Sequence, residues 1–301
     1  MLDYRLVEAF AAVIEEKGFE KAGLRLGLTQ SAVSQRIRAL EEQTGTILVI
    51  RDTPPRPSPG GERLLGLYRQ VRDLEQAALD SIGAARISGF TNLAIAINAD
   101  SLATWFLDAL LPFLDSRQIT LDIRVDDQEQ TLHYLKAGVV CACLSAQAAS
   151  VTGCQSQLLG SMEYRLCSSP VYRERWLVAG FTKEAARSAP VIHFNRDDRL
   201  QLQALERCFG AGNMAPPAHY IPSTERIFPA VLAGLGYCMI PLVQAAPALA
   251  AGTLVELHPA ARTAVQLWWH RWSLAPPGLL DLSRELEAQA ARMLTNTRPG
   301  D

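Results

Sequence analysis

The stretch Phe19-Glu-Lys-Ala-Gly-Leu-Arg-Leu-Gly-Leu-Thr-Gln-Ser-Ala-Val-Ser-Gln-Arg-Ile-Arg-Ala-Leu-Glu41 decides the architecture of the first part of this chain. Its first half predicts a short helix that stops before the turn at Gly27-Leu28, and Thr29 is of a type that favours the N-cap of a further helix. Apolar side chains then recur at helical spacing, at Ala32, Val33, Ile37 and Leu40. Two short helices about a tight glycine-containing turn form a helix-turn-helix.

The flanking sequence extends this motif in both directions. A preceding helix that ends at Gly18 is predicted by the spacing of Leu6, Ala9, Phe10, Val13 and Ile14. After the motif, the β-branched and apolar run 46–50 predicts a strand, and the proline-rich run 51–61 excludes helix. A strand and a loop in this position indicate a winged helix-turn-helix.

A long helix is predicted from Glu62 to about Ala85, since this segment lacks proline and its apolar residues step by three and four. About 24 residues at about 1.5 Å each give a helix of roughly 36 Å, which is too long and one-sided to stand alone in water. Pairing with a second chain is expected, and packing on its own chain is the alternative. The stripe consists of Leu64, Tyr68, Val71, Leu74 or Glu75, Ala78 and Ile82.

The pattern changes after a linker at Ser88-Gly89, where strands and helices begin to alternate, which is typical of an α/β sheet. The first set comprises strands at 93–97, 119–125 and 139–144 and helices at 101–114 and 131–136. A second set comprises strands at 164–168, 190–194, 219–221 and 237–240, helices at 201–209 and 227–233, a tryptophan-rich strand at 264–272 and a terminal helix at 279–294.

Composition gives bounds rather than a function. The 301 residues carry 29 Lys and Arg against 31 Asp and Glu, so any DNA-binding surface has to be local. The N-terminal sequence does not resemble a signal peptide, and no run of about 18 apolar residues predicts a membrane span. Six scattered cysteines without metal-ligand spacing are typical of a reducing compartment, so we expect a cytoplasmic protein without cofactor or metal.

The motif of residues 19–41, together with Arg51, the proline-rich loop and Gly60-Gly61, resembles the signature of LysR-type transcriptional regulators. The resemblance covers the whole chain. It implies a winged helix-turn-helix (1–61), a linker or dimerisation helix (62–87) and a periplasmic-binding-protein-like effector domain (88–301). Within that domain, subdomain one would hold about 90–160 and 268–301, and subdomain two about 161–267. It also implies a homotetramer built as a dimer of dimers, double-stranded promoter DNA and RNA polymerase as partners, and no enzymatic activity.

Three stretches are similar to the ArgP subfamily of lysine- and arginine-responsive regulators of basic amino-acid export. They are residues 49–57, the segment Asn98-Ala-Asp-Ser-Leu-Ala-Thr-Trp-Phe106, and Trp269-His-Arg271. The second is the most distinctive, because the fold does not require it. This resemblance implies L-lysine or L-arginine as the effector. A LysR-type regulator with another effector remains the main alternative.

The helix that begins after Thr29 is the expected DNA reader, because the second helix of this motif enters the major groove. Gln can bind adenine and Arg can bind guanine through paired hydrogen bonds, whereas other basic groups suit phosphate. The predicted base-reading residues, opposite the apolar face, are Gln30, Ser31, Ser34, Gln35 and Arg38. The predicted phosphate-binding residues are Thr29, Arg36, Arg51 and Arg56.

The effector is expected at the carboxyl ends of the strands, where ligands bind in open α/β sheets. Ser101, as the expected start of a helix, suits a carboxylate, and acidic side chains suit the cations of a basic amino acid. Each acid could equally be a surface charge or a cap. The predicted residues are Asp100, Ser101, Ser145, Gln147, His193, Asp197, Asp198, Thr224 and Glu225.

Two other classes of protein fit less well. A solute-binding protein shares the two-subdomain cleft but needs a signal peptide and no helix-turn-helix. An enzyme needs a nucleophile with a base, or a metal constellation, and neither is evident. The run Gly210-Ala-Gly212 resembles a dinucleotide fingerprint, but it follows a helix and Pro216-Pro217 prevents the helix that should come next.

Overall fold

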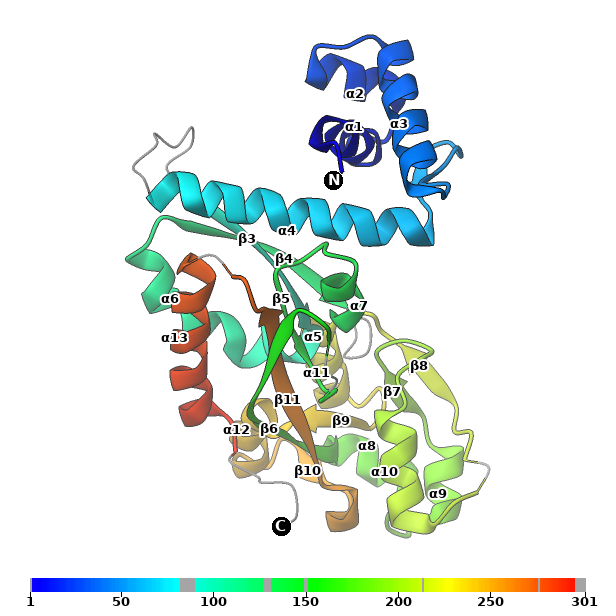
Figure 1. Ribbon diagram of the computed structural model, residues 1–301. Helices are drawn as coiled ribbons and strands as arrows, with labels where there is room; N and C mark the ends of the chain where they lie inside the picture. Colours follow the sequence, from blue (N-terminus) through cyan, green and yellow to red (C-terminus); the bar gives the residue numbers. More distant parts are fainter. Residues whose placement is uncertain are drawn as a thin grey trace.

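The computed structural model describes residues 2–81, 90–126, 131–148, 151–212, 214–275 and 277–295. At the N-terminus, helices α1 (Tyr4–Glu15), α2 (Phe19–Leu26) and α3 (Gln30–Thr44) pack around a core that includes Phe10, Val33 and Ile37. Thr29 is the N-cap of α3, and its hydroxyl accepts a hydrogen bond from the backbone N–H of Ala32. The predicted helix-turn-helix is therefore confirmed (Figure 1).

The wing is smaller than the sequence predicts. Strand β1 covers only Val49–Ile50, and it pairs antiparallel with β2 (Arg56–Pro57). The prediction of a strand over 46–50 is wrong because the carboxylate of Glu41, in α3, accepts hydrogen bonds from the backbone N–H groups of Leu48 and Val49. A side chain thus takes the backbone donors that a longer strand would use, and it ties the wing to α3.

Helix α4 (Pro59–Ser81) begins three residues earlier than predicted and runs between the helix-turn-helix and the remainder of the chain (Figure 1). The predicted pairing stripe needs correction. Leu64 and Tyr68 pack against the core of the helix-turn-helix of their own chain, while Ile82 lies outside the described residues. Leu67 is 49% exposed instead. Together with Val71 and Leu74, it forms a stripe at spacings of four and three, which is the spacing of a helix-pairing seam.

Gly61 lies in the first turn of α4, where the helix crosses the wing. A Cβ atom at Gly61 would lie 2.2 Å from the carbonyl oxygen of Leu48 and 3.2 Å from the ring of Phe10. At Gly60, the nearest contact of such a Cβ would be 3.5 Å, to the side chain of Thr46. These adjacent glycines therefore differ in the space around them.

We expect Gly61→Ala to destabilise the helix-turn-helix by about 1–3 kcal/mol, because overpacking against backbone cannot be relieved by a rotamer change. Gly60→Ala is the matched control and should be neutral or slightly stabilising, since alanine favours helix over glycine. Urea unfolding of both variants, followed by circular dichroism, measures the difference. Equal stability of the two variants would contradict the close approach at Gly61.

The effector domain is organised by a sheet with the strand order β10-β6-β11-β5-β3-β4, and β9 also pairs with β6. The parallel part consists of β3 (Thr91–Asn98), β4 (Ile119–Asp126) and β5 (Ala142–Ser145). Two long antiparallel strands, β6 (Cys154–Ser168) and β11 (Thr263–Trp272), continue the sheet, and their register shifts between Leu267 and Trp268. Helices α6 (Leu107–Asp115) and α13 (Pro277–Met293) lie side by side (Figure 1).

Strands β6 and β11 run side by side from this first unit into a second one. The second unit has its own core around Ile192, Val231 and Ile240. A parallel pair of short strands and strand β9 lie here together with five helices. They are β7 (Val191–His193), β8 (Ala218–Tyr220), β9 (Cys238–Pro241), α8 (Pro170–Trp176), α9 (Lys183–Ser188), α10 (Leu200–Phe209), α11 (Thr224–Leu232) and α12 (Leu242–Ala250). A short strand, β10 (Val255–Glu256), completes the sheet.

Several predicted boundaries are corrected. The helix expected to start at Ser101 begins as α5 (Ala99–Ser101), with Asn98 as N-cap, and passes through a π-helical turn (Leu102–Phe106) into α6. The helix expected over 227–233 begins at Thr224, and the strand expected over 139–144 lies at 142–145. Helix α7 (Thr131–Lys136) follows the prediction. Within the described ranges, no helix is long and apolar enough to cross a membrane.

Candidate functional site

The first site is the exposed face of α3. Gln30, Ser31, Gln35 and Arg38 are exposed, whereas Ser34 and Arg36 are half-buried. Thr29 is exposed as well, but its hydroxyl caps the helix and lies 3.0 Å from the hydroxyl of Ser31. The free donors and acceptors on this face are therefore amide and guanidinium groups, which suit base edges.

The two arginines of the wing are both exposed but differ in their contacts. The guanidinium of Arg51 lies 5.4 Å from the centre of the Phe19 ring, which fixes it at the start of α2. Arg56 is paired with Asp52 on the same loop. A phosphate would have to compete with that carboxylate for Arg56, so the pair makes Arg56 a weaker candidate for a phosphate contact than an unpaired arginine.

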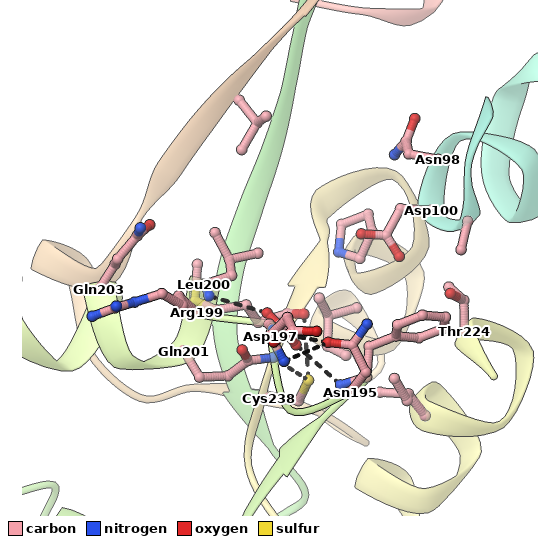
Figure 2. Close-up of a pocket in the computed structure, with 18 of the residues that line it drawn as sticks. Asn98, Asp100, Asn195, Asp197, Arg199, Leu200, Gln201, Gln203, Thr224 and Cys238 are labelled. Atoms are coloured by element: carbon pink, nitrogen blue, oxygen red, sulfur yellow. Dashed lines mark hydrogen bonds between the residues drawn. The ribbon is translucent and has the colours of Figure 1, made fainter. Parts of the chain in front are cut away.

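The second site is a cavity of about 990 Å³ in the effector domain (Figure 2). Asn98 and Asp100, at the end of β3 and in α5, line it from one subdomain. The segment 194–203, with Thr224 of α11 and Cys238 of β9, lines it from the other. The cavity thus lies between the two subdomains, at the carboxyl end of β3, as ligand sites of open α/β sheets do.

Asp100 is the acid that the surrounding protein orients most directly. Its carboxylate accepts a hydrogen bond of 2.7 Å from the hydroxyl of Tyr164, on the crossing strand β6. Burial raises the pKa of Asp100, and the charge of Asp198 raises it further, while the hydroxyls of Tyr164 and Thr224 act in the opposite direction. A carboxylate that is desolvated and faces a second acid is stabilised by a bound cation.

Asp197 and Asp198 belong to a loop that is held by its own side chains. Asn195 Oδ1 accepts hydrogen bonds from the backbone N–H groups of Asp197 and Asp198. The carboxylate of Asp198 in turn accepts from the N–H groups of Phe194 and Leu200, at 3.0 and 3.1 Å. Asp198 therefore shapes the cavity wall, whereas Asp197, which also lines the cavity, is exposed.

Four of the nine residues predicted to bind the effector line the cavity, and the other five do not. It includes Asp100, Asp197, Asp198 and Thr224. Of the others, Glu225 is exposed on α11, and the ring of buried His193 stacks on Tyr220 with 5.7 Å between centres. Ser101 is fully buried, although its hydroxyl has no hydrogen-bond partner among the described residues.

Ser145 and Gln147 are expected from sequence to face the cleft, and the structure gives them another role. Ser145, at the end of β5, is buried and its hydroxyl accepts from the N–H of Gln147. The carbonyl of Gln147 lies 2.9 Å from Nε2 of His270, whose Nδ1 lies 2.7 Å from the hydroxyl of Ser156. Burial lowers the pKa of His270, so this network fixes a neutral histidine within the sheet.

Among the polar residues of the lining that the sequence analysis missed, two could have been found from a signal in the sequence. Asn98 and Asp126 are register partners at the carboxyl ends of the parallel strands β3 and β4. The rule that placed Asp100 at this edge applies equally to them. Gln201 and Gln244 also line the cavity, and no sequence pattern distinguishes them from other polar residues on helices.

Comparison with known sequences agrees with this arrangement. Residues 4–62 match the model of bacterial regulatory helix-turn-helix proteins of the lysR family, and residues 91–291 match the model of the LysR substrate binding domain. The chain is 40% identical to the HTH-type transcriptional regulator ArgP of Photobacterium profundum. That alignment covers 97% of this chain and 98% of the relative.

Two solved structures are similar over almost their whole length. The crystal structure of ArgP from Mycobacterium tuberculosis has a TM-score of 0.91 and 37% identity, with 99% of this chain and 100% of that chain covered. Full-length LysG from Corynebacterium glutamicum, with its bound effector arginine, has a TM-score of 0.81 and 31% identity, with 98% and 100% covered.

Proposed function

The chain belongs to the LysR family of bacterial helix-turn-helix regulators, and on this premise we propose that it regulates transcription in response to a basic amino acid. Arginine or lysine would bind in the cavity between the subdomains. Helix α3 would bind the operator in promoter DNA. The protein would act in the cytoplasm, with RNA polymerase as a further partner. A ligand between two subdomains can favour one relative orientation of them, and this is the step that makes such a protein a sensor.

The excess of negative charge in the cavity is the main support for a basic amino acid as the ligand. Four carboxylates line it, from Asp100, Asp126, Asp197 and Asp198, against two guanidinium groups, from Arg196 and Arg199. Arg196 also lies over the ring of Tyr220, at 4.8 Å from its centre. A cationic side chain that enters a partly desolvated cleft needs a paired anion, and here anions are in excess. The bound arginine of LysG and the ArgP names of the relatives support the same choice.

Calorimetry with paired ligands tests this proposal. Arginine and lysine should bind. Citrulline keeps the length of arginine and norleucine keeps the carbon chain of lysine, but both lack the distal charge, so they should bind at least about tenfold more weakly, a difference of about 1.4 kcal/mol. Glutamate should not bind, because it adds charge of the sign already in excess. Equal affinity for leucine or glutamate, or no binding of either basic amino acid, would reject the proposed effector.

The proposed DNA reader makes a separate prediction. Gln35→Ala or Arg38→Ala should cost about 1–3 kcal/mol on a duplex selected by the wild-type protein from random sequences, and little on a scrambled duplex. Arg56→Ala should instead weaken both duplexes equally and reduce the salt dependence by at most about one ion, because Asp52 competes with phosphate for Arg56. Fluorescence anisotropy at several salt concentrations measures both quantities. Unchanged sequence preference in both α3 variants would exclude this face as the reader.

A further inference from the structure

Helix α7 connects the wall of the effector cavity to the helix that carries the DNA-binding module. At one end, Asp126 closes strand β4 and lines the cavity. Its carboxylate accepts a hydrogen bond of 2.9 Å from the hydroxyl of Tyr134, in α7, and this carboxylate raises the pKa of the phenol. Leu132 and Leu135 of α7 are buried in the core of the effector domain, so the helix is fixed next to strand β4, whose last residue lines the cavity.

At its other end, α7 leads into a turn whose backbone lies against the backbone of the linker helix. The turn after α7 contains Gly138, whose φ of +64° lies in the left-handed region. A Cβ atom at Gly138 would lie 2.2 Å from the Cα of Gly66 in α4, and one at Gly66 would lie 3.1 Å from the carbonyl oxygen of Ala137. Both glycines are buried. In Figure 1 the C-terminal end of α7 lies directly beneath α4.

The same part of α4 holds the helix-turn-helix. Tyr68, two residues after Gly66, packs on Tyr4 of α1 with 5.5 Å between ring centres, and the hydroxyl of Tyr4 donates to the carbonyl of Tyr68. The carboxylate of Glu15, in α1, lies 3.9 and 3.8 Å from the guanidinium groups of Arg69 and Arg72. A shift of α4 at Gly66 therefore moves the DNA reader with it.

We propose that α7 transmits occupancy of the cavity to the DNA-binding module of the same chain, through the Asp126–Tyr134 bond and the Gly138–Gly66 contact. This inference rests on the proposed basic amino-acid effector. A cation near Asp126 competes with the hydroxyl of Tyr134 for the carboxylate. A backbone contact without side chains has no rotamers with which to absorb a small shift of α7, so the shift passes to α4.

Linkage gives the test, because an effector that changes DNA affinity by some factor must have its own affinity changed by the same factor. The full-length protein is titrated with arginine by calorimetry, and with the selected duplex in the absence and presence of saturating arginine. The coupling is the ratio of the duplex affinity with arginine to that without it, or its inverse if arginine weakens binding. The length of DNA that the protein protects in footprinting is a second measure of the same change. We expect the wild-type ratio to lie between about 5 and 150, with a matching change in footprint.

Tyr134→Phe removes one hydroxyl, and Gly138→Ala places a methyl group against Gly66. Both should keep the arginine affinity within about threefold of wild type and bring the ratio close to one. The matched control is Gly252→Ala, because Gly252 has a similar φ of +70° but nothing within 4 Å of a Cβ. It shares the backbone strain of Gly138→Ala and should keep the wild-type ratio.

The outcomes separate the two hypotheses. If the wild-type protein does not bind arginine, the proposed effector fails and this inference fails with it. If arginine binds and the variants keep the wild-type ratio and footprint, or if the wild type itself shows no coupling, the role of α7 is overturned while the effector stands. Tyr134→Phe decides the question by itself if Gly138→Ala does not fold.

Discussion

Asp100→Asn should weaken arginine binding by about 30-fold or more, because the loss of one partner from a desolvated charge pair costs about 2–5 kcal/mol. The carboxylate lines the cavity, is oriented by the hydroxyl of Tyr164 and faces Asp198. Asparagine has the same shape and keeps an oxygen for Tyr164, so the change removes charge rather than packing. Calorimetry with arginine, at constant pH and salt, gives the ratio of affinities.

Asp197→Asn is the matched control, since it makes the same chemical change at an exposed residue that lines the same cavity. A screened surface charge contributes less than about 1 kcal/mol, which is roughly a fivefold change in affinity. If both variants lost the same affinity, the general charge of the cavity, and not Asp100, would be responsible for binding the cation.

The raised pKa of Asp100 also predicts how the affinity for arginine depends on pH. Arginine favours the ionised carboxylate, so its affinity should be full well above the pKa of Asp100 and should fall as the pH is lowered through it. Since burial raises this pKa above the ordinary 3.8, the fall should begin at a higher pH than for an exposed carboxylate. Asp100→Asn should lose this component of the pH dependence, and retention of the wild-type profile would assign it to another group.

Leu67→Glu should convert the protein to monomers at micromolar concentration. Leu67 is 49% exposed and Val71 and Leu74 are half-buried, and these three residues are not among those described in the core of the helix-turn-helix. A second copy of α4 is the expected partner of this apolar stripe. A carboxylate in the centre of such a seam has no counter-charge, so its burial costs several kcal/mol. DNA affinity should fall when pairing is lost, because a single module lacks the contacts of the second half-site.

Light scattering after size-exclusion chromatography measures the mass of the variant. Leu79→Glu is the control, because Leu79 is on the same helix and 46% exposed, close to the 49% of Leu67, but points about 120° away from Leu67 around the helix. That variant should keep the wild-type mass. A wild-type mass for Leu67→Glu would show that α4 is not the pairing element.

The sequence predicts the helices of the N-terminal domain well because their signals are local. Thr29 as N-cap and the periodic residues of α3 act within a few positions of one another. The stripe of α4 is misassigned from the sequence because periodicity shows that a face is apolar and not what covers it. Tyr68 and Leu67 satisfy the same pattern, and only tertiary packing places one against α1 and exposes the other.

In the effector domain, the first half of β6 and helices α8 and α9 were missed from the sequence, because the hydrophobic pattern of these segments is weak or short. The first residues of β6 include Gln155, Ser156 and Gln157, which are exposed, so this half of the strand lacks apolar alternation. Helices α8 and α9 have only seven and six residues. The sequence places the cavity correctly at the strand ends, but Ser145 and His193 also end strands and do not line it. Which strand ends converge depends on sheet order, which periodicity does not encode.

The side-by-side path of β6 and β11 has a consequence for how the chain can be divided. Gly160 and Leu267 are directly opposite each other in this antiparallel pair. The segment between them leaves and returns at adjacent points, as an inserted domain does. A turn of about two residues, such as Asn-Gly, could close the ladder there as a hairpin. The shortened chain would keep both α7 and the Gly138 turn against α4, so contact with the DNA-binding module could be studied apart from the second subdomain.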